Sequence, residues 1–519
     1  MSAPAASIPF APVVGDGGSQ LPVESTPVQP GALSPTTERA AKSMLWSVVE
    51  NGGFALLSFI ALVVYSRYLD AAAFGLFSIA LALVELLGLL VTMLFHDALV
   101  QRERVTELHY DTAFTFTLGL SIVLATASAL GAPLLAELVG RAEAAPVLQG
   151  LSLCFPATAL AATLVARQRR ELEFRALAVR TLVGRFAGAV IGIGAVLAGA
   201  GVWGLVAQQL VVALVGSVVL WFAAPARMRP RLRLGLTELR ELSAFGAYAV
   251  GSMFLSFAVK RLFVVVAGVL LGAELAGYLN LSFRAVDVLW SIAAVAISQV
   301  ALPLFSRLQG ERERLLVASR RATEFACLAL YPPFFGIALV APELVEVLFG
   351  ARWLPSAPYV TVLASLVLVR ASGLLFGPIL TALGRPRDSL IAVCAELGVM
   401  LGLLAIFGTP SLPVAAAIWV ARELVAVSIW LLFVKRAGFS LSALLGGAVA
   451  PLLASAVMAA VVSAVRLALP ADLAPAIRLT LLVVTGALGF LLGARVLGGE
   501  LLARAVGLAR SALTRKVRS

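Results

Sequence analysis

The chain contains a series of apolar stretches of about 20 residues, and this series constrains its fold more than any other feature, because a helix of that length crosses a bilayer. Of the 519 residues, 61% are hydrophobic and 13% are charged, whereas about a quarter of a soluble domain is charged. A soluble enzyme and a disordered protein are therefore excluded. We predict an all-α polytopic membrane protein with about fourteen transmembrane helices. Their expected centres are Leu56, Leu83, Leu120, Leu160, Gly192, Val212, Phe257, Ile292, Phe334, Leu368, Val399, Ile418, Ala456 and Val484.

Lysine and arginine are divided unevenly between the two sets of loops. One side holds 27 of the 40 basic residues, and the other side holds five. Loops rich in lysine and arginine stay in the cytoplasm, so the basic side is predicted to be cytoplasmic. An even number of helices places both termini there. The net charge of +12 thus predicts membrane topology rather than a nucleic-acid partner.

Two internal similarities indicate a repeat. An offset of 202 residues aligns LDAAAFG at 69–75 with LGAELAG at 271–277, and an acid, Glu85 or Asp287, follows each motif. An offset of 214 aligns VAQQLV at 206–211 with VARELV at 420–425. Because six helices separate the copies, the halves are expected to form a parallel repeat, as in transporters whose halves move against each other. The expected segments are a disordered cytoplasmic tail (1–38), an N-lobe of helices 1–6 (39–225), a C-lobe of helices 7–12 (226–437), helices 13 and 14 (438–498), and a basic amphipathic cytoplasmic tail (499–519).

Several charged residues fall inside the predicted spans, where each costs roughly 2.5–3.5 kcal/mol unless it faces protein or a water-filled cavity. Lys260 and Arg261 are adjacent, so one partner cannot neutralise both. Arg284 and Asp287 are three residues apart and can pair on one helical face. The surplus of cations on helices 7 and 8 favours an anionic ligand such as a diphosphate.

The candidate residues form two groups, and for each residue a structural tie between helices is the alternative. The expected substrate-binding residues are Lys260, Arg261, Arg284, Arg370, Glu50, Asn51 and Arg180. The residues expected to act in coupling or lobe packing are Glu85, Asp287 and Glu396.

Other chemistry finds little support in the sequence. The three cysteines and two histidines have no metal-ligand spacing, so neither a metal nor a disulfide framework is expected. A Gly-x-x-x-x-Gly-Lys nucleotide loop is absent. We therefore expect no cofactor, no catalytic residues and no enzymatic activity.

Short motifs carry a resemblance to a known family. They are Trp46 and Glu50 in helix 1, RYLDAAAFG at 67–75, RRELEFR at 169–175, WG at 203–204, LPLFSRLQ at 302–309, LFGARWLP at 348–355 and LGRP at 383–386. Over roughly residues 42–436 the chain resembles Wzx-type polysaccharide flippases of the multidrug/oligosaccharidyl-lipid/polysaccharide exporter superfamily.

The resemblance implies a fourteen-helix exporter of the bacterial inner membrane that moves an undecaprenyl-diphosphate-linked oligosaccharide outward by alternating access, for lipopolysaccharide or exopolysaccharide synthesis. It implies membrane lipids as partners and allows association with a polysaccharide polymerase machinery. Relatives often carry an acid where this chain has Lys260, which favours phosphate binding over cation coupling at this position.

Two alternatives remain open. A multidrug or cation exporter of the same superfamily would need an anionic cavity. A membrane polysaccharide polymerase, ligase or glycosyltransferase would need acids or a base in sizeable outer loops, whereas the outer loops predicted here are short.

Overall fold

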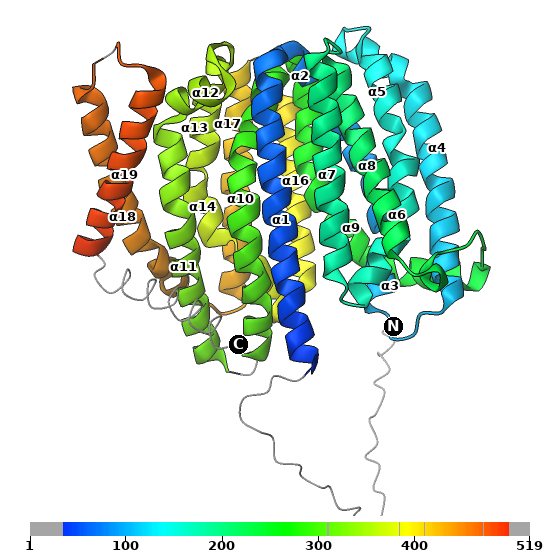
Figure 1. Ribbon diagram of the computed structural model, residues 1–519. Coiled ribbons are helices and arrows are strands. Elements are labelled where there is room, and N and C mark those ends of the chain that lie inside the picture. The colour runs from blue at the N-terminus through cyan, green and yellow to red at the C-terminus, as the bar shows by residue number, and fades with distance from the viewer. Residues whose placement is uncertain (1–34, 309–310, 384, 409–410, 471, 498–519) are drawn as a thin grey trace, which may run out of the picture.

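The computed structural model describes residues 35–308, 311–383, 385–408, 411–470 and 472–497, which form a bundle of long, roughly parallel helices (Figure 1). Twelve segments of it are long and apolar enough to cross a membrane. Two further helices, α9 (Leu236–Leu271) and α10 (Ala273–Arg307), have 36 and 35 residues, which exceeds the length needed to cross a bilayer. Each of the fourteen expected centres lies in one of these segments. The predicted all-α polytopic fold is confirmed.

We divide the helices into three groups, which follow the predicted N-lobe, the predicted C-lobe and the last two helices. The first contains α1 (Pro35–Tyr68), α2 (Ala71–Met93), α3 (His96–Gln101), α4 (Glu107–Val139), α5 (Ala144–Ser152), α6 (Cys154–Arg170), α7 (Phe174–Leu197) and α8 (Val202–Ala223). The second contains η1 (Ala226–Met228), α9, α10, α11 (Arg312–Leu339), α12 (Ala341–Phe349), η2 (Ala351–Ser356), α13 (Ala357–Ser365), α14 (Val367–Gly373), α15 (Phe376–Ala382), α16 (Pro386–Phe407) and α17 (Leu412–Arg436). The third contains α18 (Leu441–Ala468) and α19 (Pro475–Leu497).

The ends of the chain only partly overlap the described residues. Helix α1 begins at Pro35, so residues 35–38 are helical rather than part of the predicted disordered tail. The rest of that tail, and nearly all of the predicted basic tail at 499–519, lie outside the described residues.

Some predicted spans are interrupted. The fourth span contains α5 and α6, which are separated at Leu153, three residues before Pro156. Because proline has no N–H, it cannot continue the helical hydrogen bonds back to α5. The double proline Pro332-Pro333, in contrast, lies inside the continuous helix α11. Proline alone therefore does not predict where these spans break.

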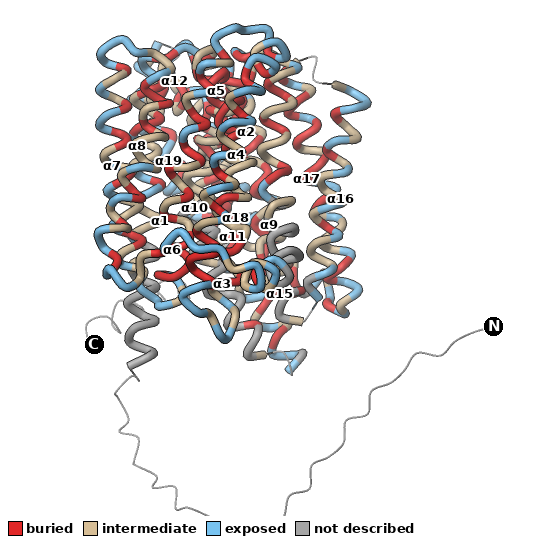
Figure 2. The backbone as a smooth tube through the Cα atoms, turned by 90° about the vertical axis from the view of Figure 1, so that its right-hand side faces the viewer, coloured by how far each residue is buried: buried red, intermediate tan, exposed pale blue. Residues whose placement is uncertain are grey.

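Burial separates central helices from peripheral ones. In the most apolar part of the span at 71–101, which contains α2, 61% of residues are buried, against 17% for the span at 387–407 within α16. Figure 2 shows the same difference, with α16 at one edge of the bundle. Large apolar side chains such as Leu130 and Phe222 are exposed, as expected for surfaces that face lipid tails.

Helices α2 and α10 cross closely near their first turns. A Cβ atom on Gly75 would overlap the backbone of Ala273, and a Cβ atom on Gly277 would overlap the backbone of Ala71. Both pairs are related by the 202-residue offset, so each helix presents the same surface to the other, as across a two-fold axis. At this crossing only glycine permits so close an approach.

The end of α12 and the short helix η2 that follows it are joined to the end of α1 at the same end of the bundle. Trp353 Nε1 donates a 2.8 Å hydrogen bond to the Ser66 carbonyl, and Arg352 donates to the Ser66 carbonyl at 2.9 Å. In return, Arg67 Nε donates to the Leu348 carbonyl at 3.1 Å. Last-turn carbonyls of a helix lack intrahelical partners, and here the two helix ends satisfy each other. We call this contact the α1–α12 junction.

Candidate functional site

Two adjoining cavities lie at the centre of the bundle. The larger, of about 340 Å³, is bordered by α2, α6, α7, α8 and α9. The smaller, of about 210 Å³, lies among α1, α2, α7, α9 and α10, with Gln209 of α8 at its boundary. Leu81, Glu85, Gln209 and Arg261 line both cavities. The smaller cavity therefore lies between the two predicted lobes.

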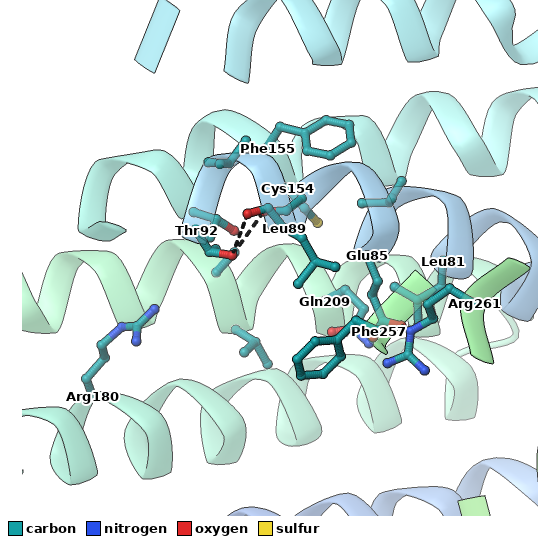
Figure 3. Close-up of a pocket in the computed structure, with 16 residues that line it drawn as sticks. Leu81, Glu85, Leu89, Thr92, Cys154, Phe155, Arg180, Gln209, Phe257 and Arg261 are labelled. Atoms are coloured by element: carbon teal, nitrogen blue, oxygen red, sulfur yellow. Dashed lines mark hydrogen bonds and ion pairs between the residues drawn. The ribbon is translucent and has the colours of Figure 1, made fainter. Parts of the chain in front are cut away.

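An ion pair connects the two predicted lobes where the cavities meet. Arg261 Nε of α9 lies 2.6 Å from Glu85 Oε2 of α2. Figure 3 shows these side chains beside Gln209 and Phe257 at one end of the larger cavity. The two side chains are 29% and 40% exposed, so both remain accessible from the cavity.

Lys260 and Asp287 form a second ion pair. The sequence allowed Asp287 to pair with Arg284, but Arg284 instead donates a 2.9 Å hydrogen bond to Asn280 Oδ1, one turn earlier in α10. Lys260 also lies over the ring of Phe283, 4.8 Å from its centroid. Lys260 and Arg261 thus have separate partners, as their adjacent positions predict.

Two arginines of the smaller cavity have no carboxylate within ion-pair distance among the described residues: Arg284 and Arg185. The Arg185 guanidinium lies 4.1 Å from the ring centroid of Phe54, and that of Arg284 lies 5.8 Å from the ring centroid of Phe74. Aromatic faces attract these cations but do not neutralise their charge. Both guanidinium groups can therefore accept an anionic ligand.

The smaller cavity carries a surplus of positive charge. Four cationic side chains line it, against two carboxylates, which leaves two uncompensated positive charges. The cations are Arg185, Lys260, Arg261 and Arg284, and the acids are Glu85 and Asp287. In a site of low dielectric constant such a surplus attracts anions strongly.

Arg180 lies at the opposite end of the larger cavity from the Glu85–Arg261 pair (Figure 3). Its buried Nε has no hydrogen-bond acceptor among the described residues. Nearby in the chain, Thr181 Oγ1 donates a 2.8 Å hydrogen bond to Glu50 Oε1. The larger cavity thus has charged groups at both ends and mostly apolar walls between them.

The remaining predicted residues lie elsewhere. Glu50 and its neighbour Asn51 on α1 line neither cavity. Arg370 and Glu396 belong to a separate cluster in the second group of helices, where Arg422 contacts both Glu396 and Glu423. Arg370 lies 3.6 Å from Glu423 and 4.3 Å from the ring centroid of Trp290. We call this set the Arg422 cluster.

Three residues that line the smaller cavity were not among the candidates chosen from the sequence: Arg185, Gln209 and Asn280. Arg185 is a charge within an apolar span, which is itself a signal. Gln209 falls within the repeated VAQQLV segment. Asn280 carried no signal, because an isolated amide in a long helix is common. Among the described residues, no group of three or more His, Cys, Asp or Glu side chains is arranged to hold a metal.

Comparison with solved structures places the fold. The chain is similar to the lipid II flippase MurJ in an inward closed conformation, with a TM-score of 0.72 and 14% identity, covering 88% of this chain and 100% of that one. It is also similar to an inward-facing multidrug resistance MATE transporter of the MOP superfamily, with a TM-score of 0.55 and 15% identity over 77% of this chain and 97% of that one.

Curated relatives are similar in sequence over about two thirds of the chain. The succinoglycan biosynthesis transport protein ExoT of Rhizobium meliloti is 29% identical over 64% of this chain and 67% of its own length. The lipopolysaccharide biosynthesis protein WzxC of Escherichia coli is 26% identical over 67% of this chain and 71% of its own. The family model described as polysaccharide biosynthesis protein matches residues 64–358. That match covers more than half of the chain, including every residue that lines the larger cavity, so this multi-pass membrane protein belongs to the polysaccharide biosynthesis protein family.

Proposed function

We propose that the protein is a flippase that exports an undecaprenyl-diphosphate-linked oligosaccharide across the bacterial inner membrane by alternating access, for cell-surface polysaccharide biosynthesis. The family, the transport function named for ExoT and the fold shared with a lipid II flippase support this proposal. The observation that carries it is the cavity between the predicted lobes, with its surplus of two positive charges.

The charge of the cavity matches that of the proposed substrate. A diphosphate esterified at both ends, to a lipid and to a sugar, keeps one negative charge on each phosphate. Arg284 and Arg185 are the primary ligands, because no carboxylate neutralises them. A guanidinium binds phosphate oxygens in a bidentate manner. Arg261 and Lys260 complete the site when they leave their present partners, Glu85 and Asp287, and bind phosphate oxygens instead.

The larger cavity accommodates sugar residues next to the diphosphate. Gln209 lies at its boundary with the smaller cavity, and Thr158 and Arg180 supply further polar groups along its wall. Glu50 and Asn51 of α1 line neither cavity, but Glu50 accepts a hydrogen bond from Thr181, the neighbour of Arg180, and both are proposed as further contacts to the sugars. The lipid tail stays in the bilayer, so the protein has to enclose only the polar head.

Movement of two lobes, at 39–225 and 226–437, would open the cavity to each side in turn. In the present arrangement the α1–α12 junction and the α2–α10 crossing join the lobes at one end. Both termini are proposed to be cytoplasmic, which makes this end periplasmic. Outward opening then requires the hydrogen bonds of Trp353 and Arg352 to break. Glu85, Asp287 and Glu396 are proposed to act in lobe packing or in coupling.

The test is export in cells that depend on this protein for surface polysaccharide. Arg284→Ala and Arg185→Ala should abolish export at normal protein levels, because each removes an uncompensated cation. Arg141→Ala is the matched control, since Arg141 is exposed and lines neither cavity. Wild-type export by both cavity variants would contradict the site.

A multidrug or cation exporter is disfavoured by the sign of the cavity charge. A cationic substrate would be repelled by the two surplus positive charges. No described feature favours the polymerase or ligase alternative, so we propose a non-enzymatic function.

A further inference from the structure

A third cavity lies away from the lobe interface, between α11, α12, α18 and α19. It has a volume of about 530 Å³ and almost entirely apolar walls, including Met458, Val462 and Leu482. Two wall residues of α19, Val483 and Leu491, are 52% and 48% exposed, so the cavity opens to the outer surface of the bundle, where α18 and α19 form one edge (Figure 1). On a membrane protein this surface faces lipid. We call this cavity the edge groove.

A charged triad lies one helical turn beyond the apolar walls. Arg466 follows Val462 by four residues on α18, and Arg478 precedes Leu482 by four residues on α19. Residues four apart lie on one face of a helix. Glu343 of α12 directly precedes the wall residue Leu344. The lining faces of three helices therefore end in charged residues at the same end of the edge groove.

The triad contains two cations and one acid. Glu343 contacts Arg466, and its Oε1 atom lies 3.4 Å from Arg478 Nε. Glu343 is 9% exposed, whereas Arg466 and Arg478 are 32% and 25% exposed. The buried Nε of Arg466 has no hydrogen-bond acceptor among the described residues. One positive charge is thus left over at the end of an apolar groove.

From this arrangement we propose that the edge groove and its triad bind an anionic phospholipid of the bilayer. The fatty acyl chains occupy the apolar walls, and Arg466 and Arg478 hold the phosphate. A phosphodiester lipid with one net negative charge matches the single surplus cation. Arginines near a helix end reach the level of lipid headgroups, where a guanidinium binds phosphate oxygens through charge-assisted hydrogen bonds. This site is independent of the substrate carried in the central cavities.

The test uses the full-length protein in nanodiscs with equal amounts of phosphatidylglycerol and phosphatidylethanolamine. After detergent extraction, the lipids that stay bound are identified by native mass spectrometry. The wild type should retain phosphatidylglycerol about tenfold over phosphatidylethanolamine, the ratio expected from about 1.4 kcal/mol. In R466Q/R478Q this ratio should fall to that of the nanodisc.

Three further variants separate the proposal from a purely structural role of the triad. R466K/R478K keeps the charges and should keep the preference for phosphatidylglycerol. Ala487→Trp obstructs the edge groove and should lower retention of both lipids alike. The control Arg141→Gln, an exposed arginine far from the groove in the chain, should behave as the wild type. A wild-type headgroup ratio in folded R466Q/R478Q, or loss of the preference in R466K/R478K, would overturn the proposal.

Discussion

The smaller central cavity and the Arg422 cluster both place charges inside the bundle, but they do so in opposite ways. In the cavity, four cations face two carboxylates, and the paired side chains are 25–42% exposed. In the Arg422 cluster, two arginines face two glutamates, and their side chains are 4–28% exposed. Buried charges are stable when they are paired. An open, unbalanced set is therefore suited to a ligand, and a closed, balanced set to packing.

The largest expected effect tests the structural side of this comparison. Arg422→Ala would leave the half-buried Glu396 without its cation and Glu423 with Arg370 alone, and should destabilise the protein by about 3 kcal/mol, the lower end of the range for breaking a buried pair. Thermal unfolding in detergent would measure the loss. The matched control is Arg422→Lys, which keeps the charge and should recover part of the stability. Unchanged unfolding of Arg422→Ala would show that the cluster is not structural.

Arg284→Gln tests the functional side. It removes a cation that has no carboxylate partner, so the thermal stability should change by less than about 1 kcal/mol, in the range of ordinary partly exposed substitutions. Export of surface polysaccharide should nevertheless be lost. If stability and export fell together, the contrast with the Arg422 cluster would fail.

A smaller effect is expected at the α1–α12 junction. Trp353→Phe removes the hydrogen bond to Ser66, which is worth about 0.5–1.5 kcal/mol, together with part of a fully buried ring. The cavity should then open more readily toward the periplasm. Reaction of a cysteine introduced at Val288, which lines the smaller cavity and is half-buried, with a membrane-impermeant reagent would report the shift. Equal labelling in both backgrounds would exclude a gating role for this bond.

The smallest expected effect concerns pH. Glu85 forms an ion pair with Arg261, and Asp287 forms one with Lys260. Arg284 and Arg185 line the same cavity. Because each acid is already held in an ion pair, we assign both to packing rather than to proton coupling. We therefore expect export by Glu85→Gln and Asp287→Asn to depend on pH as in the wild type near neutrality. A pH dependence that disappears in either variant would instead indicate proton coupling.

The sequence allowed the helices to be predicted more completely than their contacts. Helix centres such as Leu83 and Ile418 follow from apolar length, which is a local property. The partner of Asp287 does not, because the choice between Arg284 and Lys260 depends on how α9 packs against α10. Arg370 attracted attention for the same reason as Arg284, its charge within an apolar span. Only tertiary packing separates it from the cavity and places it beside Glu423.

The reciprocal crossing of Gly75 and Gly277 has a consequence for protein engineering. Gly75 contacts Ala273, which lies four residues before Gly277, and Gly277 contacts Ala71, which lies four residues before Gly75. The two surfaces are therefore interchangeable. A symmetric homodimer built from one half of the molecule would keep this contact unaltered. A bulky residue introduced at either position, in contrast, would force the helices apart and separate the halves on one face of the membrane.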